Sequence, residues 1–289
     1  MQKTVNGLRY ILLIFSLLSA FSFQTLGIDK NFKSRFLNQE MFKGKVKSIV
    51  QEYRVVVYDE DFDLEESSYM KNIKEFDING NILSDITYNK KGIKQIITYK
   101  YNESGLLTEI TRHETSSNIT YTSIYTYDSN DNILESMLTT GRDSDYYQKE
   151  EYKYDLNGLV IESISTLKYG ENIVINRFTY SYDKSSKLIE ERVYDSNNIF
   201  QIKNSNIYDT KGNLIRIEFV TKDGKTGISH ISTYDLNNLK LSERIPAGMS
   251  DVFCKFKYDE KGNITEIAYS APNSLDIVTS KSVRVIQYY

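Results

Sequence analysis

Two histidines and several groups of acidic residues are the side chains of this sequence that could do chemistry. His113 and His230 are its only histidines, and neither has a second ligand at the spacing that zinc sites use. The segment Lys43-Gly44-Lys45 lacks the upstream glycine and the following Ser or Thr of a phosphate-binding loop. The chain also has no nucleophile elbow. Surface or strand positions explain both histidines, and we expect neither to be catalytic.

The acidic segment 59–66 is the strongest candidate for binding a cation. Its first three aspartates stand at every second position, as at the start of a calcium-binding loop. However, Leu64 stands where the sharp turn of such a loop needs glycine, and Met70 stands where the bidentate Glu belongs. We therefore interpret the segment as a solvated acidic loop, and we predict no metal ion and no cofactor.

A set of recurring glutamates raises the possibility of a glycosidase, which needs one carboxyl group as acid and another as base or nucleophile. Because they stand at about the same place in successive parts of the sequence, we interpret them as a structural row on the polar face of a sheet. Lys100, Arg177 and Lys257 are candidates for cross-strand ion pairs with this row. A hydrolase with converging carboxyl groups stays an alternative. The glutamates are Glu109, Glu135, Glu162, Glu190, Glu218 and Glu266.

These side chains must be positioned by a repeated element that fills most of the chain. Each copy, such as Tyr154-Asp155-Leu156-Asn157-Gly158-Leu159, has an aromatic residue, Asp or Asn, two variable residues, a turn residue and an aliphatic run. Copies recur about every 26 residues. The aromatic position holds Phe76, Tyr101, Tyr127, Tyr154, Tyr182, Tyr208, Tyr234 and Tyr258. The acid position holds Asp77, Asn102, Asp128, Asp155, Asp183, Asp209, Asp235 and Asp259. The glycine position holds Gly80, Gly105, Asp131, Gly158, Ser186, Gly212, Asn238 and Gly262.

The repeated element predicts a hairpin. The acid side chain can accept a backbone N–H two residues on, which closes an Asx-turn, and Gly, Asn or Asp then tolerates a positive φ. Ser186 is the weak copy, so its turn must differ or be strained. Before the turn, Tyr99 and Tyr101 fall on one face of a strand and Lys100 on the other. One repeat is therefore a hairpin, and consecutive hairpins form an antiparallel meander.

Two strands for each repeat, with two more between residues 45 and 76, give about 18 strands in an all-β domain. A twisted meander of this length must curl or close into a barrel-like sheet. If round, such a barrel is too wide for side chains to fill, so it must flatten into a sandwich, hold water or lie in lipid. One edge carries the uniform turns, and the other carries variable loops such as 139–145.

The Tyr-Asp-x-x-Gly pattern followed by Asn or Leu and an aliphatic residue resembles the YD repeat of Rhs-type proteins. It is also similar to small exported YD-repeat proteins of bacteria with a porin-like β fold. The resemblance covers residues 43–289. The repeats here are longer than those usual in large Rhs shells, which favours the smaller proteins. The resemblance implies a β architecture and implies no catalytic residues.

The first residues predict export. Lys3 and Arg9 precede a short apolar run with the flanks of a secretory signal. We therefore expect a signal peptide at 1–22, an N-terminal arm at 23–42 and one YD-repeat domain at 43–289. The net charge of −3 gives no reason to expect nucleic acid as a partner. The lone Cys254, in a strand pattern, indicates a small buried or half-buried thiol.

The composition leaves two exported states open. The chain has 24 Tyr and no Trp, and tyrosines just before tight turns would form the aromatic girdle of an outer-membrane barrel. The more apolar face is interrupted by Gln95 and Arg112, which disfavours contact with lipid. We expect a soluble, non-enzymatic scaffold at the cell envelope, periplasmic, at the cell surface or secreted, that binds a protein or a glycan through its edge loops. An integral outer-membrane barrel, as a channel or anchor, is the alternative.

Overall fold

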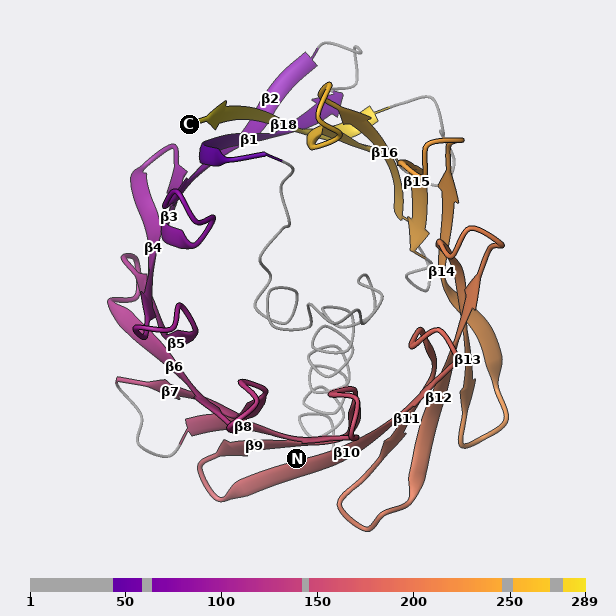
Figure 1. Ribbon diagram of the computed structural model, residues 1–289. Coiled ribbons are helices and arrows are strands. Elements are labelled where there is room, and N and C mark those ends of the chain that lie inside the picture. The colour runs from indigo at the N-terminus through magenta and orange to yellow at the C-terminus, as the bar shows by residue number, and fades with distance from the viewer. Residues whose placement is uncertain (1–43, 59–63, 142–145, 246–251, 271–277) are drawn as a thin grey trace, which may run out of the picture.

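The repeats form a single closed sheet. The computed structural model describes residues 44–58, 64–141, 146–245, 252–270 and 278–289. The described residues form an 18-stranded antiparallel sheet in which β1 (Val46–Tyr58) pairs with both β2 and β18 (Val278–Tyr288), so the sheet closes into a barrel (Figure 1). The predicted all-β meander of about 18 strands is confirmed. The other strands are β2 Leu64–Phe76, β3 Ile82–Asn89, β4 Gly92–Tyr101, β5 Leu107–Glu114, β6 Ile119–Tyr127, β7 Ile133–Thr140, β8 Tyr146–Tyr154, β9 Val160–Tyr169, β10 Asn172–Tyr182, β11 Leu188–Tyr194, β12 Phe200–Tyr208, β13 Leu214–Thr221, β14 Thr226–Tyr234, β15 Lys240–Ile245, β16 Val252–Tyr258 and β17 Ile264–Ser270.

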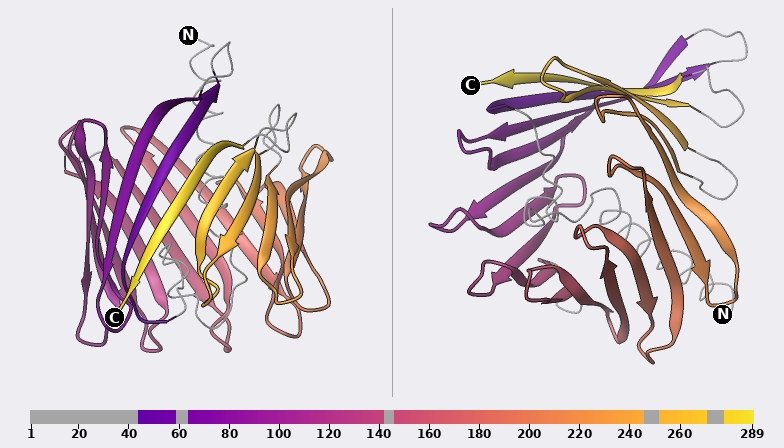
Figure 2. Two further views of the ribbon diagram at one scale, coloured as in Figure 1. Left: turned by 90° about the horizontal axis from the view of Figure 1, so that it is seen from above. Right: turned by 45° about the vertical axis from the view of Figure 1, so that its right-hand side comes forward.

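The closed barrel is round rather than flattened into a sandwich. Extensive contacts between described strands join hydrogen-bonded neighbours, and the strands surround a central space and tilt against the barrel axis (Figures 1 and 2). Among the described residues no helix is long and apolar enough to cross a bilayer. The predicted signal peptide (1–22), the N-terminal arm (23–42) and the aspartates of the acidic segment (59–63) lie outside the described residues.

The eight repeated turns form one edge of the barrel and share one geometry. Oδ1 of Asp155 accepts the backbone N–H of Asn157 at 2.8 Å and of Leu159 at 2.9 Å, and the hydrogen bond from Leu159 is the main reason why the pKa of Asp155 is lowered. Every residue at the glycine position has a positive φ, with Gly158 at 78° and Ser186 at 63°. The predicted Asx-turn is confirmed, and Ser186 adopts the same turn under strain.

A β-bulge accompanies each of these turns and sets which side chains face inward. The register between β8 and β9 shifts between Lys153 and Tyr154. As a result Val160 and Ser163 are both buried, whereas Ile161 between them is 42% exposed. This spacing, buried at the first and fourth positions after the turn, recurs in β3, β11 and β13. The bulge in each repeat therefore turns the same strand positions toward the inside of the barrel.

The tyrosine face of the strands lines the inside of the barrel. Side chains on a concave wall converge and shield one another, whereas those on the convex wall spread apart. Tyr152, Tyr180 and Phe178, on the tyrosine face, are buried, and they pack with Ile133, Val160 and Leu188 in a core cluster. Side chains on the other face remain open, such as Lys153, which is 69% exposed. We call these two faces the inner and the outer face.

The tyrosines of the repeated turns, which we call rim tyrosines, join each repeat to the one before it. The hydrogen-bond ladder between β7 and β8 ends at Glu135 and Glu151, beyond which the carbonyl of Ile133 points toward β8. The phenol of Tyr154 donates to that carbonyl. Each rim tyrosine makes the equivalent bond: Tyr101 to Ile82 (3.0 Å), Tyr127 to Leu107 (2.5 Å), Tyr154 to Ile133 (2.7 Å), Tyr182 to Val160 (2.7 Å), Tyr208 to Leu188 (2.8 Å), Tyr234 to Leu214 (3.1 Å) and Tyr258 to Lys240 (2.6 Å).

At the seam where the barrel closes, the first copy of the repeat meets the last residues of the chain. Phe76 has no hydroxyl, and no earlier turn of this kind precedes it in the sequence. It packs with Val46, Ile49 and Ile82, and its carbonyl accepts the phenol of Tyr289 at 2.5 Å. The last residues of the chain therefore close the barrel onto the first hairpin.

Candidate functional site

The outer face carries a row of ion pairs that follows the repeat. Glu109 pairs with Lys100 at 2.7 Å, Glu162 with Arg177 at 3.1 Å, and Glu266 with Lys257 at 3.0 Å. The predicted cross-strand pairs are therefore confirmed. Further pairs of the row join Lys153 to Glu162, Lys149 to Glu135, Lys203 to Glu190 and Lys281 to Glu266.

One residue, Glu218, was wrongly predicted to belong to this row. Arg216 holds the corresponding position, so the repeat changes here. Glu109, Glu162 and their equivalents stand at the third position of the strand after the turn, but Glu218 stands at the fifth position of β13. Arg216 holds the third position and pairs with Glu218 at 2.9 Å. The sign of the charge is therefore reversed at this one junction. The error came from matching residue type rather than register.

The inner face changes at the same place. Two residues before the rim tyrosine, the strands β4, β6, β8 and β10 carry Tyr99, Tyr125, Tyr152 and Tyr180. The corresponding residues of β12 and β14 are Asn206 and Ser232. Small polar side chains replace aromatic rings there, so polar groups can gather on this part of the inner wall.

A buried polar cluster occupies this part of the inner face. His230 Nε2 lies 2.7 Å from Ser232 Oγ, and His230 Nδ1 lies 3.2 Å from Glu243 Oε1. Lys240 Nζ donates to Glu243 Oε2 at 3.0 Å. The order Ser, His, Glu matches the connectivity of a hydrolase triad. However, Ser232 is only 4% exposed, so in this conformation the cluster joins β14 to β15 and presents no open nucleophile.

The charges of this cluster are strongly coupled. Burial alone would raise the pKa of Glu243, but the hydrogen bond from His230 and the charge of Lys240 outweigh it and lower the pKa to about 2. Cys254 pairs with Glu243 across β15 and β16. Burial, with the nearby Glu243 carboxylate, raises the pKa of the Cys254 thiol to about 11. The predicted buried thiol is confirmed.

The two histidines differ in their surroundings. His113 lies near the end of β5, with its Nδ1 at 3.1 Å from Thr120 Oγ1, in keeping with the expected strand position. His230 lies in β14 and is 2% exposed, so it has the strand position of the two that were expected. Within the described ranges, no three His, Cys, Asp or Glu side chains gather as they would around a metal ion.

Two further carboxyl groups of the inner face have raised pKa values, those of the buried Glu191 and the half-buried Glu150. Burial raises the pKa of Glu191 to about 7, against a hydrogen bond from Asn204 that lowers it. Burial likewise raises the pKa of Glu150 to about 7, against hydrogen bonds with Ser165 and Gln148. Each carboxyl group therefore has its own hydrogen-bond partners, while the charges of both act on Tyr180.

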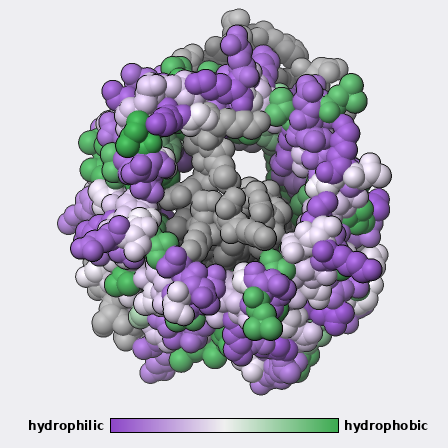
Figure 3. Space-filling view, in the orientation of Figure 1, coloured by the Kyte–Doolittle hydropathy of each residue, from purple (hydrophilic) through white to green (hydrophobic). Residues whose placement is uncertain are grey.

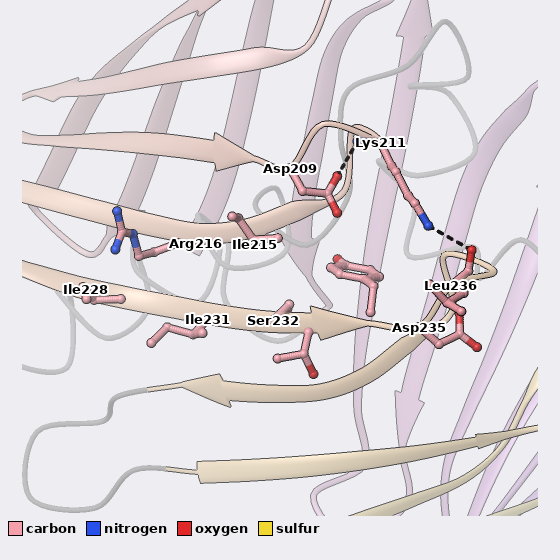
Figure 4. Close-up of a pocket in the computed structure, with 11 residues that line it drawn as sticks. Asp209, Lys211, Ile215, Arg216, Ile228, Ile231, Ser232, Asp235 and Leu236 are labelled. Atoms are coloured by element: carbon pink, nitrogen blue, oxygen red, sulfur yellow. Dashed lines mark hydrogen bonds between the residues drawn. The ribbon is translucent and has the colours of Figure 1, made fainter.

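A cleft of about 850 Å³ lies where β13 and β14 part near the turn edge (Figure 4). Ile215, Ile228 and Ile231 supply apolar surface, and Arg216 lies on the strand beside them. Lys211 of one turn donates to the carbonyl of Leu236 in the next turn at 3.0 Å and closes the cleft toward the rim. The other residues that line the cleft are Asp209, Ser232, Thr233, Tyr234 and Asp235.

The predicted repeat residues build the turns of the barrel. The residues of the aromatic, acid and glycine positions all lie at the turn edge. Only Asp209, Tyr234 and Asp235 of them also line the cleft. The cleft and the buried cluster were missed from the sequence. The departures from the repeat at Ser232 and Arg216 are the signal that could have found them.

The chain has only low similarity to known proteins. No family model matches the chain, and no curated protein matches it. Among solved structures, a porin-like protein from Bacteroides uniformis is 12% identical, with 85% of this chain and 98% of that chain covered and a TM-score of 0.47. A porin-like protein from Bacteroides vulgatus is 12% identical, with 84% and 98% covered and a TM-score of 0.24. The chain spans 15% of the matched chain in the structure of TcdB2-TccC3-Cdc42, at 13% identity, 78% coverage of this chain and a TM-score of 0.30.

Proposed function

We propose that this protein is a non-enzymatic barrel scaffold of the cell envelope whose outer wall stands in water. The observation that carries the proposal is the row of ion pairs on the outer face. Lys149, with a side chain 29% exposed, lies between Glu135 at 2.9 Å and Glu151 at 3.1 Å. These three charges belong to adjacent strands, β7 and β8, on the convex side.

Charges of this kind are costly in lipid. Each Lys or Arg near the middle of a lipid-facing strand costs about 2–4 kcal/mol, and pairs such as Arg177 with Glu162 recur around the wall. In water the same groups are solvated at no such cost, and each pair adds a little stability. In the view along the barrel, hydrophilic residues predominate around the rim and hydrophobic ones are scattered among them (Figure 3). A water-facing wall therefore accounts for the outer face more simply than a lipid-facing wall.

An integral outer-membrane barrel is the second candidate, because one feature of the outer face favours it. The second residue after each turn is often an exposed aliphatic side chain, such as Leu83 at 49%, Leu134 at 45% and Leu241 at 47%. These residues form an apolar row on the outer face near the turn edge, as at the border of a lipid-facing band, whereas the rim tyrosines lie on the inner face. The row of charges begins one residue further along each strand.

The proposed role is the binding of a protein or a glycan by a rigid wall. Loops at the variable edge were the expected binding surface, but residues 142–145, 246–251 and 271–277 of that edge lie outside the described residues. The cleft between β13 and β14 is a described alternative, and it lies at the uniform turn edge. Rigid strands on both sides hold its lining in place.

Expression of the chain with its first 22 residues, followed by fractionation, tests this proposal. A water-facing barrel is released into a soluble fraction and stays monodisperse without detergent. An outer-membrane barrel stays with the membrane, needs detergent and runs heat-modifiable on a gel. Soluble release with hydrolytic activity toward glycosides that is lost in Glu191→Gln would contradict the non-enzymatic part of the proposal.

A further inference from the structure

We infer that the cleft between β13 and β14 binds the acyl chain of an anionic amphiphile, with the chain over Ile215 and Ile231 and the acidic head group at Arg216. The inference goes beyond the proposed function but rests on its water-facing wall, because the cleft can select a ligand only if the outer wall stands in water. It names a ligand class for a site at the turn edge.

The shape and lining of the cleft fit an aliphatic chain. Ile231 faces Arg216 across the two strands, and Ile215 lies on the turn side of Arg216, toward Lys211 (Figure 4). Ile228 faces Glu218 on the side away from the turn and is 36% exposed. The Lys211 contact with Leu236 closes the end near the rim, so a chain that enters beside Arg216 has an apolar path with a stop. The volume of about 850 Å³ lies in the range of small-molecule sites. Burying each CH₂ group of a chain is favourable.

The charge at the entrance selects an anionic head group. Arg216 pairs with Glu218 at 2.9 Å, and both side chains are 44% exposed. An ion pair this exposed is weak, so Glu218 can turn into water when a ligand arrives. The guanidinium group then offers two parallel N–H donors to a carboxylate or a phosphate.

The β5–β6 junction has a similar aliphatic side chain at the same place in the repeat, but without the positive charge. Ile231 faces Arg216 across β13 and β14, and Ile124 faces Glu109 across β5 and β6 at the same place in the repeat. Ile124 is 52% exposed. The β5–β6 junction therefore offers a similar aliphatic side chain beside a negative charge, which would repel an anionic head group.

Compared with the equivalent position in other repeats, the positive charge of Arg216 is specific to this junction. Glu occupies the equivalent position at Glu109, Glu135, Glu162, Glu190 and Glu266. A structural need for charge at this position would be met by Glu here as well. The reversal coincides with the cleft, so we assign it to ligand binding rather than to the fold.

The test is calorimetric titration of the purified, delipidated mature protein without detergent. The probes are dodecanoate, dodecanol and a lauroyl lysophosphatidylglycerol, each below its micelle concentration. We expect saturable binding of one dodecanoate per chain. Arg216→Gln should weaken dodecanoate about tenfold or more, as loss of a charge-assisted contact implies, and should leave the weaker binding of dodecanol unchanged. Tighter binding of the lysophospholipid would identify a lipid head group as the source of the anion.

Two position-matched variants separate the cleft from general surface hydrophobicity. Ile231→Asn should weaken all three probes, whereas Ile124→Asn should leave them unchanged. Equal effects of these two variants, or no saturable binding of dodecanoate and the lysophospholipid, would overturn the inference. Arg216→Glu restores the residue that the repeat usually carries, so it should keep the circular dichroism spectrum while losing dodecanoate binding. A protein that needs detergent overturns the proposed function as well, but a detergent-free barrel that binds no probe overturns only this inference.

Discussion

The phenol of Tyr154 donates a hydrogen bond to the backbone carbonyl of Ile133 at 2.7 Å, one strand away and beyond the end of the sheet ladder. Ile133 is 1% exposed, so its carbonyl has little access to water. The same contact in the other repeats explains why an aromatic residue with a hydroxyl recurs just before each turn. It is a structural bond that holds neighbouring hairpins together where their strands part.

Replacement of Tyr154 by Phe should therefore destabilise the barrel. The variant keeps the ring but leaves the Ile133 carbonyl without its donor, and an unsatisfied buried acceptor costs about 1–3 kcal/mol. Tyr169→Phe is the matched control, because Tyr169 is 62% exposed and such a surface change should stay within about 0.5 kcal/mol. Urea unfolding measures both variants, and equal stability of the two would refute a structural role for the bond.

The rim tyrosines should also make the barrel lose stability at alkaline pH. Burial, followed by the charges of neighbouring tyrosines, raises the pKa of Tyr127 to about 12, and burial with Tyr234 and Asp235 does the same for Tyr258. The phenol in an unfolded chain has a pKa of about 10. Because the folded pKa is the higher one, the stabilisation is complete below about pH 10 and is lost as the pH rises toward about 12.

Absorbance at 295 nm and circular dichroism, followed together from pH 9 to pH 13, test this loss of stability. We expect an exposed class of tyrosines to ionise near pH 10 with the fold intact, and a buried class to ionise as the strand signal is lost. Ionisation of every tyrosine near pH 10 in an intact barrel is the outcome that would rule it out.

The turn at Ser186 offers a gain in stability. Its φ of 63° is costly for a residue with a Cβ atom, whereas glycine adopts it freely. Ser186→Gly should stabilise the protein by about 0.5–1 kcal/mol after the greater backbone freedom of glycine in the unfolded chain is counted. Ser185→Gly, next to it in the same turn, should give no gain, and thermal unfolding of the two variants makes the comparison.

Glu191 should make the barrel less stable at neutral and higher pH. Its folded pKa of about 7 lies above the unfolded value of about 4.3, so its contribution is fully present below about pH 4 and is lost as the pH rises through 7. Glu191→Gln keeps an acceptor for Asn204 and carries no charge. It should raise the free energy of unfolding at pH 8 by on the order of 2–3 kcal/mol and change it little at pH 4.

Glu109 is the control for this pH dependence. The hydrogen bond from Lys100 lowers its pKa on the outer face, so its contribution has the opposite sign and is present above its unfolded pKa. Glu109→Gln should bring no gain at pH 8. A gain in both variants would indicate a general effect of lowering the negative charge.

The architecture could be predicted because its determinants are local. Asp155 and Gly158 define a turn within six residues, and the alternation of Tyr99, Lys100 and Tyr101 defines the faces of a strand. Repetition then fixes the number of hairpins, and the twist of a long meander makes closure the expected result. Only the round, open form of the barrel could not be derived, because it depends on how all the walls pack at once.

The site could not be predicted because it depends on register between strands. His230 meets Glu243 in the β14–β15 register that follows the shift between Thr233 and Tyr234, and a pattern of residue types does not reveal bulges. The same limit led to Glu218 being placed in the row that Arg216 occupies. A comparison of each repeat with the others, position by position, would have marked both places.

Fractionation of the chain expressed with its first 22 residues tests the central claim most directly. An outer wall that carries ion pairs such as Lys149 with Glu135 should release the protein into a soluble fraction, monodisperse without detergent. Recovery in the outer membrane, with extraction only by detergent and a heat-modifiable band on a gel, would contradict a water-facing wall and would make the exposed aliphatic row the lipid border.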